Sequence, residues 1–167
     1  MVRIALLEDI PIIQKIAHAP WPSAYGAIIS AEQISYMLDL MYSNESLLQQ
    51  MVKGHQFYLF EQQSLNHEST DTLGFASVSK ESETIFKLNK LYVVPTAHKS
   101  GAGKALLSAV KAYAIQHGGK ELILQVNKQN PAIGFYKRQG FSILSEQVFE
   151  LDHGFVMDDY IMGISLH

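Results

Sequence analysis

Hydrophobic and polar positions alternate over several stretches of the chain, mostly in its middle and towards its C-terminal end. Alternation with a period of two residues is typical of strands that have one face in a core. A nearly continuous apolar stretch at 120–126 is typical of a strand buried on both faces of a sheet. Together these patterns predict seven strands, at 2–6, 56–62, 73–81, 84–94, 120–126, 141–151 and 155–166. The polar residues 63–72 predict a hairpin connection between the second and third strands.

Apolar residues at helical spacing predict five helices, most of them in the first third of the chain. Capping residues mark where each helix begins, and glycines mark where several end. The expected starts are Asp9 with Pro11, Ser30, Ser43, Gly103 and Asn130 with Pro131, and the expected stops are Gly54, Gly118 and Gly140. One helix therefore joins the strand at 84–94 to the strand at 120–126, which predicts a parallel crossover in an α/β sheet.

Composition limits the classes of protein to which the chain can belong. With 167 residues, 47% of them hydrophobic, the chain can build one domain, expected to span 1–167. A net charge of −3 gives no global attraction to nucleic acid or to an anionic membrane. The chain has no cysteine, no signal-peptide pattern and no apolar window approaching a membrane span, so we expect a soluble, cytoplasmic protein without nucleic-acid or membrane partners.

Two familiar kinds of site are not supported by the motifs. The seven histidines include no HExxH arrangement, so no metal site is expected. No serine lies in a nucleophile elbow, which argues against a hydrolase.

The segment VPTAHKSGAGKALL (94–107) leads from a strand through two glycines into a helix. It is not a P-loop, because Gly103-Lys104 is followed by Ala105, and it lacks the third glycine of the dinucleotide fingerprint. It keeps the property that both motifs share, which is a row of backbone N–H groups, here those of 100–104, at a helix N-terminus. Such a row can bind a pyrophosphate, although the glycines can also serve only to make a tight turn.

The segments LYVVPTAHKSGAGKALL (91–107) and NPAIGFYKRQGF (130–141) together resemble the two cofactor motifs of the GCN5-related N-acetyltransferase (GNAT) family. The resemblance implies a single-domain fold with a central, mixed but mostly antiparallel twisted sheet of about seven strands and helices on both faces. It also implies acetyl-CoA as the acetyl donor, a small-molecule amine as the acceptor, and a possible homodimer.

The resemblance carries roles to individual residues. Leu91, Tyr92 and Val93 would offer their backbone to the pantetheine arm of acetyl-CoA. Asn130, Phe135 and Arg138 would contact other parts of the cofactor, and Tyr136 would lie near the thioester sulfur as the catalytic residue. The loop on the pyrophosphate would comprise His98, Lys99, Ser100, Gly101, Ala102, Gly103 and Lys104.

The chain departs from the family pattern at two positions. His98 stands where Arg or Gln is usual, which weakens charge assistance but leaves the backbone donors. Lys87 stands where family members often have a glutamate, so the base that must deprotonate the acceptor's ammonium is not identified. The candidate bases are Glu81, Glu83, Asp158 and Asp159.

Tyr136 has more than one possible role. Its pKa of about 10, against about 8.5 for a thiol, makes full proton transfer to the CoA thiolate uphill by roughly 2 kcal/mol. Tyr136 is then either a tuned acid or chiefly a hydrogen-bond donor, and packing of its helix on the sheet is the alternative.

The acceptor is the least determined part of the site. Trp21 and Tyr25, in PWPSAYGAIIS (20–30), are candidate contacts to the acceptor, and packing of that loop is the alternative. Glu83, Asp158 and Asp159 are further candidates for binding the substrate. WPSAY together with FVMDDYIM is most similar to the bacterial polyamine N-acetyltransferase branch, while other amines remain open. A chain that binds acyl-CoA without transferring the acyl group is the second reading.

Overall fold

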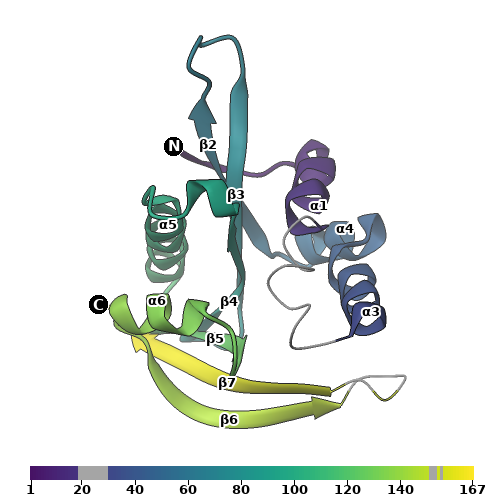
Figure 1. Cartoon of the computed structure of the whole chain (residues 1–167). Coiled ribbons are helices and arrows are strands. Elements are labelled where there is room, and N and C mark those ends of the chain that lie inside the picture. The colour runs from purple at the N-terminus through teal and green to yellow at the C-terminus, as the bar shows by residue number, and fades with distance from the viewer. Residues whose placement is uncertain (19–29, 151–153, 155) are drawn as a thin grey trace.

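The computed structural model of the chain describes residues 1–18, 30–150, 154 and 156–167. At its centre is a seven-stranded sheet in the order β1-β2-β3-β4-β5-β7-β6 (Figure 1). β4 and β5 are parallel, and all other neighbours in the sheet are antiparallel. The strands are β1 (Val2–Ile4), β2 (Gln56–Gln63), β3 (Thr70–Lys80), β4 (Ile85–Val93), β5 (Glu121–Asn127), β6 (Ser142–Glu150) and β7 (Val156–Ser165). The mixed, mostly antiparallel sheet expected from the sequence is confirmed.

Helices cover both faces of the sheet, as expected (Figure 1). On one face, α5 and α6 enclose a core that includes Phe86, Leu106 and Leu124. On the other face, α1, α3 and α4 enclose a second core around Phe57 and Phe75. The described α-helices are α1 (Ile10–His18), α3 (Ala31–Tyr42), α4 (Asn44–Val52), α5 (Ala102–Gln116) and α6 (Ala132–Arg138), and two 3₁₀ turns are η1 (Leu7–Asp9) and η2 (Pro95–Ala97).

The helix starts expected at Ser30 and Ser43 are correct, whereas the one expected at Asp9 is wrong. α5 begins at Ala102, one residue before the expected Gly103. The Ser30 and Ser43 hydroxyls accept hydrogen bonds from the backbone N–H groups three residues later, both at 3.1 Å. Asp9 lies in η1 before α1, and its buried carboxylate accepts the Leu6 N–H and two hydrogen bonds from Arg3. The Arg3 guanidinium lowers the pKa of Asp9. A carboxylate forms its strongest hydrogen bonds with a charged donor, which explains why Asp9 binds Arg3 instead of capping α1.

Strand boundaries differ from the prediction mainly at the β2–β3 hairpin. The connection is 64–69 rather than 63–72, because the ladder runs on to the Gln63–Thr70 pair. The residues at this end are polar and exposed, so their side chains gave no sign of a strand that is held by backbone hydrogen bonds. β1 is shorter than expected and ends at Ile4.

The apolar sequence of β5 predicts burial on both faces of the sheet, but only one face of the strand is buried. Leu122, Leu124 and Val126 are buried against α5 and α6, while Ile123 and Gln125 on the opposite face are half-buried. The half-buried face of β5 belongs to the side of the sheet on which α1, α3 and α4 lie.

Candidate active site

The parallel strands β4 and β5 pair at one end and separate at the other. Their ladder runs from Ile85–Glu121 to Leu88–Leu124, after which β4 is paired only with β3 and β5 only with β7. A bulge at Asn89 lies where they separate: Leu88 is opposite Val78, whereas Lys90 is opposite Ser77. The β4 edge of Leu91, Tyr92 and Val93 that faces β5 is thereby left outside the sheet's ladder. Extended ligands can bind such an edge through the backbone.

The bulge also changes which side chains of β4 face each core. Before it, Phe86 and Leu88 lie in the core under α5; after it, Leu91 and Val93 lie against that core. Tyr92 packs in the core under α1, α3 and α4, and the Lys90 ammonium lies 5.1 Å from the centroid of the Tyr42 ring of α3. One extra residue therefore directs Lys90 and Tyr92 away from α5.

The glycine turn leads from β4 through η2 into α5. Lys99 and Gly101 have positive φ angles of 68° and 87°, and Gly101 precedes the first residue of α5. The first backbone hydrogen bond of the helix is donated by Ala105 to the Gly101 carbonyl, at 2.9 Å. The Gly103 and Lys104 N–H groups come before that bond, at the positive end of the helix dipole.

Fewer of the backbone N–H groups of 100–104 are available to a ligand than the sequence predicts. The Ser100 N–H is donated to the Ala97 carbonyl, and the Ala102 N–H to the Ser100 hydroxyl. The Ser100 hydroxyl in turn donates to the Ala97 carbonyl, so this side chain holds the turn together. Gly103 and Lys104, rather than the whole row, are the donors best suited to a phosphate.

His98 is exposed, and its ring is held by β4 itself. Nε2 lies 3.0 Å from the Val93 carbonyl oxygen, which can only accept, so Nε2 carries the proton and donates it. The ring therefore braces the end of β4 to the turn.

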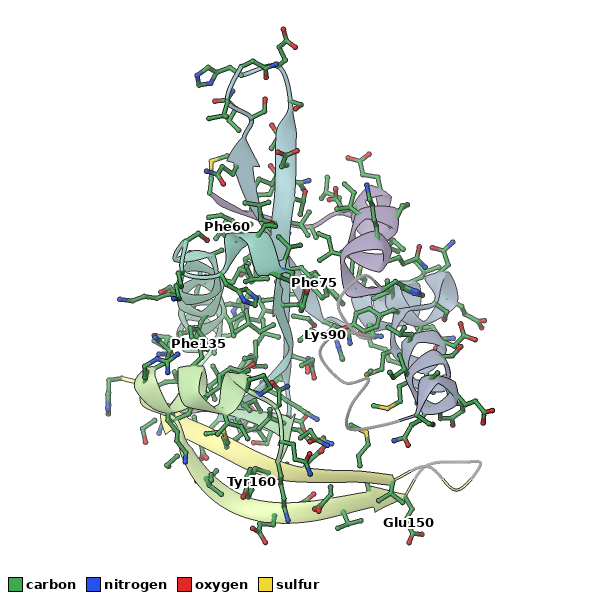
Figure 2. All side chains as sticks on the ribbon, viewed as in Figure 1. Phe60, Phe75, Lys90, Phe135, Glu150 and Tyr160 are labelled. Atoms are coloured by element: carbon green, nitrogen blue, oxygen red, sulfur yellow. The ribbon has the colours of Figure 1, made fainter. Side chains whose placement is uncertain are left out.

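Three of the predicted cofactor residues lie together where β4, α5 and α6 meet. A Cβ atom built on Gly103 would lie 3.4 Å from Phe135 Cζ and 3.8 Å from Val93 Cγ2. Phe135 extends from α6 on the α5 side of the sheet (Figure 2). The absence of a side chain at Gly103 therefore leaves its backbone uncovered beside an aromatic ring.

Tyr136 and Asn130 occupy defined positions on or next to α6. Tyr136 is 7% exposed, and its ring makes edge-on contacts with Phe135 and Phe141. The Asn130 carboxamide oxygen accepts the N–H of Ala132, the first residue of α6, at 2.8 Å, while the N-cap position itself is Pro131 rather than the expected Asn130. Arg138 is exposed at the other end of α6.

The adjacent carboxylates of β7 lie in opposite environments. Asp158 is exposed and forms an ion pair of 3.0 Å with Lys128. Asp159 is completely buried; its Oδ2 accepts a hydrogen bond of 2.7 Å from Gln125, while its Oδ1 has no hydrogen-bond partner among the described residues. Burial raises the pKa of Asp159. Gln125 and Asp159 belong to the face of the sheet opposite α5.

Other sequence-predicted residues are not brought to this place. Glu83 is in the turn before β4, at the end far from Leu91, and its side chain is 94% exposed, with Lys80 at 3.6 Å. Ten residues of extended chain separate Glu83 from Val93, roughly 30 Å. Trp21 and Tyr25 lie outside the described residues.

Sequence reasoning missed Lys90 and Gln125. Lys87 and Lys90 are three residues apart in TIFKLNKLYVV, which breaks the period of two. That break was the available indication of a bulge, and a bulge would have placed both lysines on one face.

The comparisons with known proteins agree with this geometry. The family model described as "Acetyltransferase (GNAT) domain" matches residues 27–159. The chain is 31% identical over 156 residues to the uncharacterised N-acetyltransferase YuaI of Bacillus subtilis, an alignment that covers 90% of this chain and 84% of that one. The chain belongs to the GNAT acetyltransferase family. It is an N-acetyltransferase that uses acetyl-CoA as its acetyl donor.

Two further similarities concern proteins of Thermoplasma acidophilum. A spermidine N(1)-acetyltransferase is 27% identical over 143 residues, covering 85% of this chain and 88% of that one. The crystal structure of the PaiA N-acetyltransferase in complex with coenzyme A has a TM-score of 0.79 at 24% identity, covering 99% of this chain and 98% of that one. The structural similarity establishes the same fold.

The described residues fit an acetyl-CoA molecule. The edge of β4 that lies outside the ladder suits its amide-bearing arm, although the Val93 carbonyl there already accepts a hydrogen bond from His98. The Gly103 and Lys104 N–H groups, which precede the first backbone hydrogen bond of α5, suit its pyrophosphate. Within the described ranges, no helix is long and apolar enough to cross a membrane. No group of three or more His, Asp or Glu side chains in the described part of the chain is placed to hold a metal ion.

Proposed function

We propose that this N-acetyltransferase acetylates a primary amine by direct attack on acetyl-CoA in a ternary complex, with polyamines as the acceptor class. The observation that carries the proposal is Asp159, a buried carboxylate with one oxygen lacking a hydrogen-bond partner. A buried, unpaired carboxylate oxygen is costly unless a ligand satisfies it. An ammonium group would supply both the charge and the missing hydrogen bond.

The arrangement of the two faces favours a ternary complex. The pyrophosphate donors are at the start of α5, whereas Asp159 and Gln125 belong to the other face. Between these two sets of residues, β4 and β5 are no longer paired beyond Leu88 and Leu124. A thioester arm that follows Leu91, Tyr92 and Val93 would enter from the α5 side, and the amine would approach from the opposite side.

The chain's own residues then have distinct tasks. Gly103 and Lys104 bind the pyrophosphate, and the β4 edge orients the arm. Asp159 binds an ammonium group of the acceptor. Tyr136, next to Phe135 on α6, donates a hydrogen bond to the departing thiolate of CoA.

Similarity to a spermidine N(1)-acetyltransferase supports the polyamine class. Spermidine is the substrate in the name of that relative, not an established substrate of this chain. A polyamine carries several ammonium groups at neutral pH, because an alkylamine has a pKa of about 10.4. One ammonium can pair with Asp159 while another amine reacts.

The test is thiol release from acetyl-CoA over a panel of diamines, spermidine, spermine, amino acids, an aminoglycoside and lysine-containing peptides. We expect turnover with the polyamines above the other amines. Asp159→Asn should raise the KM for the polyamine by roughly 10–100-fold, because a charge-assisted hydrogen bond is replaced by a neutral one. Asp158→Asn is the matched control, since Asp158 is exposed and paired with Lys128.

A preference for another amine class would overturn the polyamine assignment. An equal KM in Asp159→Asn and the wild type would overturn the role of Asp159. The second candidate, a chain that binds acyl-CoA without transfer, is favoured by Lys87, which stands where a glutamate is common in the family. Calorimetric binding of acetyl-CoA without thiol release on any amine would support it.

A further inference from the structure

Lys90 is a partly buried cation without a carboxylate partner in the described structure. It follows the Asn89 bulge at the point where β4 leaves β5. Its side chain extends to the α3 and α4 side of β4 (Figure 2), with Nζ 5.1 Å from the centre of the Tyr42 ring. The ion pairs of the described chain all involve other basic residues. A lysine is rarely buried without a partner, so its presence needs an explanation.

The described surroundings of Lys90 include two lysines and one carboxylate, together with two buried polar atoms that have no hydrogen-bond partner there. Ser77 is its neighbour across the ladder, and the buried Ser77 hydroxyl has no hydrogen-bond partner; the same holds for Nδ1 of His55, just before β2. The charged and titratable groups of this region are Lys87 on β4, Lys53 after α4, Glu81 after β3, His55 and Tyr42.

These surroundings favour the neutral form of the amine. Burial, followed by the positive charge of Lys87, lowers the pKa of Lys90 to about 8. Burial and then the charge of Lys90 itself lower the pKa of His55 in the same way. At pH 7 a group with a pKa of 8 is neutral in about one molecule in ten, against about one in 2,500 for an ordinary lysine.

We propose that Lys90 is the general base that takes a proton from the ammonium group of the acceptor. The assignment rests on the proposed function, since it requires an amine acceptor on this face of the sheet. The proposed base is a lysine, whereas the candidate bases named from the sequence are all carboxylates. It also gives a reason for the bulge, which directs Lys90 to the same face as Asp159.

The proton and electron balance is complete without another reactant. The acceptor's ammonium gives one proton to neutral Lys90 and becomes a free amine. The nitrogen lone pair forms the new C–N bond with the acetyl carbon, and the C–S bond breaks with its electron pair on sulfur. The nitrogen loses a second proton, the CoA thiolate gains one, and Lys90 returns its proton to solvent.

The acceptor's own charge assists the transfer. Proton transfer from an alkylammonium with a pKa of about 10.4 to a lysine with a pKa of about 8 is unfavourable by roughly 250-fold, a modest part of an enzymatic barrier. A second ammonium group nearby would repel protonated Lys90 and favour its neutral form, while Asp159 would bind that group. A polycationic acceptor is thus compatible with a lysine base.

Substitution by arginine separates a base from a residue that only binds an anion. Arginine keeps the positive charge and cannot be deprotonated in proteins. A general base is therefore lost in both Lys90→Arg and Lys90→Met, whereas an anion-binding role survives in Lys90→Arg. Lys80→Met is the matched control, because Lys80 is an exposed lysine at the C-terminal end of β3, opposite Phe86 rather than Lys90.

The experiment measures kcat between pH 6 and 9.5 at saturating acetyl-CoA and polyamine, together with acetyl-CoA affinity and melting temperature. In the wild type and Lys80→Met, kcat should rise with pH to a plateau, with an apparent pKa near 8. Lys90→Arg and Lys90→Met should lose 10²–10³-fold of kcat, and the inflection near 8 should disappear. Acetyl-CoA affinity should stay within about threefold.

Two results would overturn the proposal while leaving the proposed function in place. One is a Lys90→Arg enzyme with a plateau within threefold of the wild type, which would mean that the reaction needs the positive charge of Lys90 and not its basicity. The other is an unchanged inflection near pH 8 in Lys90→Met. A wild type that binds acetyl-CoA but acetylates no amine would overturn the proposed function and the role of Lys90 together.

Discussion

The two faces of the sheet differ in the buried polar atoms that they contain. The α5 face is apolar and closely packed: Phe86, Leu106 and Leu122 are at most 1% exposed, and a Cβ atom on Gly74 would lie 2.6 Å from the Tyr92 carbonyl oxygen. The opposite face holds buried polar atoms without partners, among them Ser77 Oγ and Asp159 Oδ1. Under the proposed function, the first face offers backbone groups to acetyl-CoA, and the second offers side chains to the acceptor.

The substitution with the largest effect expected on this comparison tests whether the α5 side of the sheet contributes only side-chain packing and backbone groups. Tyr136→Phe keeps the ring contacts with Phe135 and Phe141 and removes only the hydroxyl. If the hydroxyl assists the departing thiolate, kcat should fall by about 100-fold while acetyl-CoA affinity stays nearly constant. Steady-state kinetics and calorimetric titration measure the two quantities. An unchanged kcat would assign Tyr136 to packing, and the comparison of the two faces would become sharper.

A matched pair of alanine substitutions tests the packing difference directly. Gly74→Ala forces a methyl group against the Tyr92 carbonyl and Leu106, and should cost about 1–3 kcal/mol of unfolding free energy. Ser77→Ala, three residues along the same strand, removes a buried hydroxyl that has no partner, and should be neutral or slightly stabilising. Urea denaturation of both variants measures the free energies. Equal losses would contradict the distinction between the faces.

The smallest effect concerns the stability of the unliganded protein. Because the pKa of Asp159 is raised on folding, its contribution to stability is present below about pH 4 and is lost as the pH rises through the folded pKa. Asp159→Asn does not ionise, so its stability relative to the wild type should increase from pH 4 to pH 7. Thermal melts at several pH values would show it. A difference that does not change with pH would mean that burial does not suppress ionisation of Asp159.

The contrast between the faces also explains what could be predicted from the sequence. Gly101 and Asn130 are predictable because turns and helix starts depend on local residue types: Gly101 has a positive φ angle, and Asn130 accepts a hydrogen bond from the first residue of α6. The roles of Lys90 and Gln125 depend on which neighbours lie across the sheet. A strict period of two over 84–94 does not include the bulge, and so it puts Lys87 and Lys90 on opposite faces instead of the same one.

The errors have similar causes. The polar β2–β3 hairpin is longer than expected because backbone pairing does not need apolar side chains. Asp9 was assigned to a helix cap because its partner Arg3, six residues earlier, belongs to a different element. The family resemblance identifies Lys87 as the residue at the usual glutamate position. The pairing of β4 with β3 shows that Lys90, after the bulge, lies on the same face as Lys87.

The single extra residue at Asn89 divides β4 into two parts of opposite parity. Shortening the strand by this residue would exchange the faces of all side chains on one side of it, turning Leu91 and Val93 towards α3 and Lys90 towards α5. Point substitutions at 90 and 92, in contrast, leave unchanged the backbone edge along which the arm of acetyl-CoA is proposed to bind. Acceptor preference in this protein can therefore diverge by ordinary substitutions while donor use stays fixed, and a one-residue deletion would disturb both at once.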